Sequence, residues 1–182
     1  MEQYVLTAEA LLKARTYVPI REKTAFVNEI APKCFDRLQI TAGDQEPMPP
    51  MYMENAALKA RYLMTALVKL YLRDASVWGE PDDEWLMTEE AYDRFAGSHI
   101  FAQIQRFKSD AALRNQSFDL LDDFRELERM LTAQMRGMLA AQNDAVLRQQ
   151  LLNREAMGQL PEVLKSLREL QEAEKRKKKG GG

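Results

Sequence analysis

The densest group of ionisable side chains in this 182-residue chain lies between residues 80 and 99. Seven carboxylates come first, and the chain's one histidine, His99, ends the group. The carboxylates are Glu80, Asp82, Asp83, Glu84, Glu89, Glu90 and Asp93. Side chains of these types serve as general acids and bases, as metal ligands or as a surface that attracts a cationic partner. The spacing and the surrounding elements decide among these roles.

His99 is expected to have a structural role. It follows Gly97 and Ser98, which indicate a left-handed helix end and the cap of the next helix, so His99 falls in the first turn of that helix. No serine or cysteine near it forms a nucleophile motif, and no second histidine is present for a metal pair. The sequence therefore predicts no catalytic residue and a protein that is not an enzyme.

A second set of carboxylates has helical spacing and suggests a metal site at first sight. Asp119, Asp122, Asp123 and Glu126 share one helix face. Di-iron helical bundles, however, need Glu-x-x-His pairs on facing helices, and the chain has no such pair. Arg125 and Arg129 lie along the same helix, so a solvated, salt-bridged face is the expected reading, with no metal and no cofactor.

The acidic group at residues 80–93 has two interpretations, and both stay open. A dense carboxylate surface can enter a cationic groove, and Trp85 and Tyr92 supply the aromatic anchors that interfaces favour. Alternatively, Asp82, Asp83, Glu89 and Glu90 lie where helix N-termini favour negative charge. The predicted partner-binding residues are Glu80, Asp82, Asp83, Glu84, Trp85, Glu89, Glu90, Tyr92 and Asp93.

The C-terminal tail carries five consecutive basic residues: Lys175, Arg176, Lys177, Lys178 and Lys179. They are candidates for a weak contact with the phosphate backbone of a nucleic acid. They also suit a solvated helix end, because cations stabilise helix C-termini. Both readings remain.

Apolar residues recur at helical spacing along most of the chain, so the expected fold is all-α. We expect a bundle of short helices followed by long C-terminal helices with a coiled-coil-like seam. The short helices begin at Thr7 with Leu11, Leu12 and Tyr17 on the apolar face, and continue from Pro19 to an end near Pro32. A loop is expected at residues 41–51, then a core helix at 54–73. No strand of useful length is predicted.

The long-helix seam is formed by Leu120, Phe124, Leu127, Leu131 and Met138. Breaks are expected at Asn143–Asp144 and at Gly158–Pro161, because these residues favour caps or interrupt helices. The chain should therefore consist of a helical domain at 1–143 and a C-terminal helical extension with the basic tail at 144–182.

Charge and composition exclude several classes of protein. The net charge of −2 argues against nucleic-acid binding through bulk charge, although residues 1–97 hold 11 Lys/Arg against 16 Asp/Glu, a balance of −5. Cys34 is the one cysteine, so no internal disulfide forms, and a buried structural thiol is expected. The most apolar segment, residues 62–72, is too short to span a bilayer. A cytoplasmic protein of a bacterial host cell is expected.

The blocks "ENAALKARYLMTALVKLYL" and "DEWLMTEEAYDRFAGSHIFAQIQRFKSDAALR" give the chain a resemblance. It resembles small helical proteins of bacterial prophages and mobile elements, among them anti-CRISPR proteins. The resemblance implies a non-enzymatic binding protein, most concretely an inhibitor of a type II CRISPR effector nuclease that binds it directly through the acidic group. The alternative is a scaffold-like phage structural or assembly protein that self-associates, as a homodimer or larger, through the Leu120–Met138 seam and the C-terminal helix.

Overall fold

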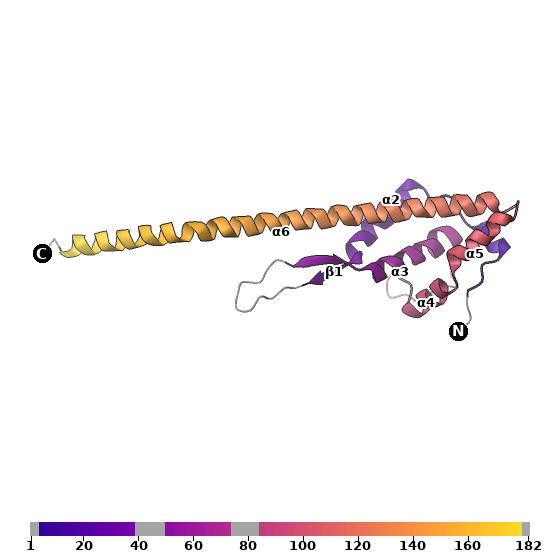
Figure 1. Cartoon of the computed structure of the whole chain (residues 1–182), viewed down its shortest axis with the longest axis horizontal. Helices are drawn as coiled ribbons and strands as arrows, with labels where there is room; N and C mark the ends of the chain where they lie inside the picture. The colour runs from indigo at the N-terminus through magenta and orange to yellow at the C-terminus, as the bar shows by residue number, and fades with distance from the viewer. Residues whose placement is uncertain (1–3, 39–49, 74–83, 180–182) are drawn as a thin grey trace. The chain divides into compact units, whose positions relative to one another are not determined.

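The computed structural model describes residues 4–38, 50–73 and 84–179 (Figure 1), and beyond residue 149 it describes the side chains of Leu152 and Lys165 only. The chain divides into two compact units, Met1–Leu139 and Ala140–Gly182. The sequence placed this boundary at residue 143. Within the described ranges, no helix combines the length and the hydropathy needed to cross a membrane.

The first unit begins with two helices, α1 (Ala8–Lys13) and α2 (Ile20–Ile30). The Thr7 hydroxyl accepts a hydrogen bond from the Ala10 amide at 3.1 Å and so caps α1 as expected. The predicted apolar face is only partly right, because Leu11 is buried but Leu12 and Tyr17 are exposed. The chain leaves the α-helical conformation at Ala14, before the helical repeat could turn Tyr17 inward.

Pro32 ends α2 as predicted. The chain continues from Ile30 into one 3₁₀ turn, η1 (Ala31–Cys34), which contains this proline. Two strands then form a hairpin, β1 (Phe35–Leu38) and β2 (Met51–Glu54), paired antiparallel with Phe35 opposite Glu54 and Leu38 opposite Met51. The protein is mostly helical as predicted, but this two-stranded sheet shows that it is not strictly all-α. These strands have four residues each and mostly exposed side chains, so they lack a clear hydrophobic alternation.

The predicted core helix at 54–73 is present as α3 (Ala56–Ala66) followed by the π-helical segment η2 (Leu67–Leu72). Arg73 ends it in the left-handed conformation, with φ of 56°. Figure 1 shows α3 packed beside α4 (Glu89–Gly97), which precedes α5 (Ile100–Arg106) and the 3₁₀ turn η4 (Phe107–Ser109).

The connection between α4 and α5 differs from the prediction in detail. Gly97 belongs to the last turn of α4, and His99 is the left-handed residue, with φ of 54°. Ser98 does not cap α5; its hydroxyl donates a hydrogen bond to the Phe95 carbonyl at 2.5 Å. The bond helps close the end of α4, and the left-handed residue lies two residues later than the glycine suggests.

The last helix, α6, runs from Arg114 to Lys179 without the predicted breaks. Asn143 and Asp144 are weaker helix formers by only a few tenths of a kcal/mol each, which their helix-favouring neighbours outweigh. The backbone is helical across Gly158 and Pro161 as well. The caps predicted at Asn143 and Asp144 are wrong because Ala, Leu, Gln and Arg, which are good helix formers, flank these residues.

The seam on α6 lies inside the core of the first unit. Leu120, Leu127 and Leu131 are fully buried, and Phe124 is 3% exposed. Phe124 packs edge-on against Tyr71 of η2, with ring centroids 5.7 Å apart. The apolar repeat therefore packs against helices of the same unit. This packing accounts for the repeat without a coiled coil.

Candidate partner-binding site

The acidic residues of α4 lie at its exposed face. The Thr88 hydroxyl accepts a hydrogen bond from the Ala91 amide at 3.2 Å, which fixes the start of the helix and places Glu89 and Glu90 in its first turn. Both carboxylates are exposed, as is Asp93 one turn after Glu89. The helix dipole stabilises negative charge near the start of α4, so the capping interpretation explains part of this cluster.

A hollow of about 440 Å³ separates this face of α4 from the beginning of α3. Its lining brings together three of the predicted partner-binding residues, Glu89, Tyr92 and Asp93. The complete lining is Asn55, Ala57, Leu58, Arg61, Glu89, Tyr92 and Asp93. The hollow is open to solvent, so a side chain of another molecule can enter it. We call it the α3–α4 hollow.

Arg61 occupies one part of the α3–α4 hollow. Its guanidinium donates to the Met87 carbonyl at 2.7 Å and to the Glu89 carboxylate at 3.3 Å. The Arg61 side chain is 16% exposed, whereas that of Glu89 is 85% exposed. The pair therefore lies at the rim, and it neutralises one of the two carboxylates that line the hollow.

Trp85 is half-buried and packs against the first unit, so its indole is already engaged within the protein. Its indole N–H donates to the Glu29 carboxylate at 3.0 Å, and its ring packs edge-on against Phe26. Lys69 lies over the indole at 4.2 Å and also pairs with Glu84 at 2.9 Å. These contacts connect the segment before α4 to α2 and η2, which assigns Trp85 a packing role.

The remaining predicted site residues lie outside the part that the structure describes. Glu80, Asp82 and Asp83 precede the described segment that begins at Glu84. The side chains of Lys175, Arg176, Lys177, Lys178 and Lys179 are likewise outside it, although the backbone of these residues is helical. Their assignments stay predictions.

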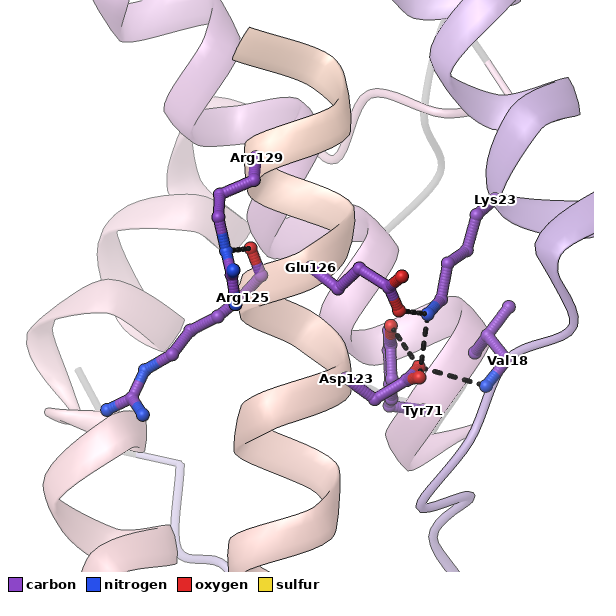
Figure 2. A network of polar contacts seen from close by, with 7 residues as sticks. All are labelled: Val18, Lys23, Tyr71, Asp123, Arg125, Glu126 and Arg129. Carbon is purple, nitrogen blue, oxygen red and sulfur yellow. Dashed lines mark hydrogen bonds and ion pairs between the residues drawn. The ribbon is translucent and has the colours of Figure 1, made fainter. Parts of the chain in front are cut away.

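A second polar cluster, which we call the Lys23 network, lies between α6 and the residues Val18, Lys23 and Tyr71 (Figure 2). Lys23 is 1% exposed, and its ammonium donates to Asp123 at 2.6 Å and to Glu126 at 2.5 Å. Asp123 also accepts from the Tyr71 hydroxyl at 2.9 Å and from the Val18 amide at 3.0 Å. The predicted solvated face is therefore wrong for Asp123, whose side chain is only 9% exposed.

The network shifts two pKa values in the same direction. Burial raises the pKa of Tyr71, and the hydrogen bond that its hydroxyl donates to Asp123 raises it further. Burial disfavours the charged form of Lys23, but the hydrogen bonds to Asp123 and Glu126 outweigh this effect and raise its pKa. Both groups therefore keep their protons, which suits a fixed structural connection.

Arg125 and Arg129 do not both neutralise the carboxylates as expected. Arg125 pairs with Asp122 at 3.0 Å, but the Arg129 Nε donates to the backbone carbonyl of Arg125 at 3.3 Å. The side chains of Asp119, Asp122 and Glu126 line a second open hollow of about 570 Å³ with Tyr17. Among the residues described, no three His, Cys, Asp or Glu side chains are grouped to hold a metal ion.

Two other candidates are settled by their surroundings. Cys34 is fully buried, which confirms the predicted structural thiol, and burial raises its pKa to about 11. His99 is exposed, and its left-handed backbone starts α5. Neither residue lines the α3–α4 hollow or the second hollow.

No protein-family model, no curated protein and no solved structure matches this chain.

The sequence did not indicate that Lys23 is a buried residue. One signal was available: Lys23, Phe26, Val27 and Ile30 follow the helical repeat, so Lys23 lies on the buried face of α2. A lysine at such a position requires a carboxylate from another element. The acidic ladder of α6 supplies it through Asp123 and Glu126.

Proposed function

We propose that this chain is a non-enzymatic protein that binds a basic surface of another protein through the acidic face of α4. The observation that carries the proposal is the α3–α4 hollow, in which Glu89, Tyr92 and Asp93 lie together at an exposed surface. Carboxylates beside an aromatic ring suit a cationic protein surface, because charge steers the encounter and the ring adds contact area.

The proposed partner, in its most concrete form, is a type II CRISPR effector nuclease. Such a nuclease holds its guide–target duplex in a positively charged channel, which an acidic protein face complements. The resemblance to anti-CRISPR proteins supports this choice. The inhibitor would occupy part of the basic surface and lower DNA cleavage without any chemistry of its own.

The test is co-elution with a purified effector nuclease, together with a DNA-cleavage assay. The double variant Glu90→Lys/Asp93→Lys should lose co-elution and inhibition, since it reverses two exposed charges on the α4 face. Glu128→Lys is the matched control, because Glu128 is an exposed carboxylate on α6 outside the hollow. Equal behaviour of the two variants and the wild type would refute the acidic-face mechanism.

The alternative is an assembly protein that self-associates, and the structure restricts how it would do so. The Leu120–Leu131 part of the predicted seam is buried in the first unit, so it is not available to a second copy. In the second unit, Leu147 is 56% exposed and Leu152 is 64% exposed, so self-association would have to use that segment. Light scattering across a concentration series tests it: a constant monomer mass excludes this role.

A further inference from the structure

The α3–α4 hollow holds one carboxylate whose charge is not balanced within the described part of the chain. Arg61, Glu89 and Asp93 are the charged residues of its lining, which gives a net charge of −1. Arg61 pairs with Glu89 at 3.3 Å. Asp93 has neither an ion pair nor a hydrogen bond from its side chain to any residue in the described ranges. One added cation would make the hollow neutral.

Tyr92 lies beside this carboxylate and lines the same hollow. Its side chain is half-buried, so the ring is fixed against the unit while part of it stays accessible. A guanidinium that stacks on an aromatic ring can pair with a neighbouring carboxylate at the same time, because its charge is planar and its donors lie at the edge. An ammonium can also lie over a ring and pair with a carboxylate, as Lys69 does with Trp85 and Glu84. It lacks the planar fork with which a guanidinium stacks flat on the ring and donates two parallel hydrogen bonds.

The chain's own Arg61 shows what the hollow accepts. Its guanidinium uses a backbone carbonyl, that of Met87, and the carboxylate of Glu89. A volume of about 440 Å³ leaves space for a second side chain, since pockets that enclose small ligands begin near 300 Å³. Because Glu89 already neutralises Arg61, the repulsion of a second guanidinium is reduced.

We propose that the α3–α4 hollow receives an arginine side chain of the partner, with its guanidinium paired to Asp93 and stacked on Tyr92. The inference rests on the proposed function, because it names the group of the basic partner that contacts this face. It also separates the nine predicted residues into those that make the specific contact and those, such as Glu90, that contribute only general charge.

The probes are two peptides, octa-arginine and octa-lysine, titrated against the full chain by calorimetry at low salt, where surface charges are least screened. The wild type should bind octa-arginine more tightly than octa-lysine. Asp93→Asn should weaken octa-arginine binding by about threefold to tenfold, the range expected for losing one charge-assisted contact at a partly exposed site. Tyr92→Leu should remove the preference for arginine.

Glu90→Gln is the matched control, because Glu90 is an exposed carboxylate of the same helix that does not line the hollow. It should change octa-arginine affinity by less than twofold. Circular dichroism of all variants verifies that they are folded. Equal losses for Asp93→Asn and Glu90→Gln would overturn the inference but leave the proposed function standing, since the face would then act by general charge. Absence of any arginine preference in the wild type would also overturn it. Failure of the nuclease co-elution test, with the arginine preference intact, would overturn the nuclease as the partner and leave the arginine contact standing.

Discussion

Lys23 of α2 and Asp123 of α6 form a buried ion pair of 2.6 Å, although they lie 100 residues apart in the sequence. The same carboxylate accepts hydrogen bonds from Val18 and from Tyr71, so three separate segments meet at Asp123 (Figure 2). In such a pair the charges are costly to bury but far more costly to separate. This pair therefore determines where the segment before α2 lies against α6.

Lys23→Met should lower the free energy of unfolding by about 3–5 kcal/mol, because Asp123 then stays buried without its cation. Urea unfolding followed by circular dichroism measures the change. Lys13→Met is the control: Lys13 pairs with Glu9 at the surface, where both side chains are more than 70% exposed, and it should leave the unfolding curve unchanged. If the Lys23 variant unfolds at the same urea concentration as the control, the network contributes little to stability.

Stability should fall as the pH rises above about 9, and Cys34 should account for the first part of the fall. Burial raises the pKa of Cys34 from 9.0 to about 11; Lys59 lowers it and Glu54 raises it, each by a smaller amount. Between these pH values the unfolded chain loses the thiol proton while the folded chain keeps it, so folding becomes less favourable as the pH rises. The free energy of unfolding should fall by on the order of 2 kcal/mol over this range. The raised pKa values of Tyr71 and Lys23 act in the same direction at higher pH.

Cys34→Ala isolates the thiol in this pH dependence. Urea unfolding of the variant and of the wild type at several pH values from 8 to about 11 gives two slopes. The slope of the variant should be shallower between pH 9 and 11, whatever its absolute stability. Parallel slopes would show that the thiol proton is not linked to folding.

Trp85 and Tyr92 should separate stability from binding. Trp85→Ala should lower the free energy of unfolding by about 1.5–3 kcal/mol, because it removes the contacts with Phe26, Glu29 and Lys69. Tyr92→Ala should cost less stability but reduce the affinity for a basic partner. Thermal unfolding of both variants measures the loss of stability, and peptide titration measures the loss of affinity. A larger loss of affinity in the Trp85 variant would restore Trp85 as the interface anchor.

Much of the fold follows from local patterns, and the exceptions have physical causes. The Thr7 cap, the end of α2 at Pro32 and the core helix at 56–72 depend on neighbouring residues, so the sequence indicated them. The hairpin depends on pairing between residues 35–38 and 51–54, and such short, exposed strands leave little pattern. The left-handed residue at His99 depends on how α4 packs beside α5, which residue type alone does not predict.

The candidate site was predictable in part. The chemistry of Glu89, Tyr92 and Asp93 and their shared helix face could be derived from spacing alone, but the contribution of Arg61 could not. Arg61 reaches Glu89 from a helix 28 residues earlier, and the pairing depends on how α3 packs on α4. The packing of Trp85 could not be predicted either, because its contacts with Glu29 and Lys69 are non-local. These contacts hold Trp85 against the first unit, although its residue type suggests an interface anchor.

Gln103 should fix the N-terminal segment through one side chain. Its amide oxygen accepts from the Leu6 amide at 2.7 Å, and its amide nitrogen donates to the Tyr4 carbonyl at 2.9 Å and to the Ser98 carbonyl at 2.7 Å. Gln103→Leu leaves these partly buried backbone groups without a partner, which should cost about 1–3 kcal/mol and speed proteolysis of the segment before α1. Gln105→Leu, an exposed change on the same helix, should do neither. Limited proteolysis with mass spectrometry, combined with thermal unfolding, gives both measurements, and equal cleavage rates in the two variants would show that packing of Leu6 alone holds the segment.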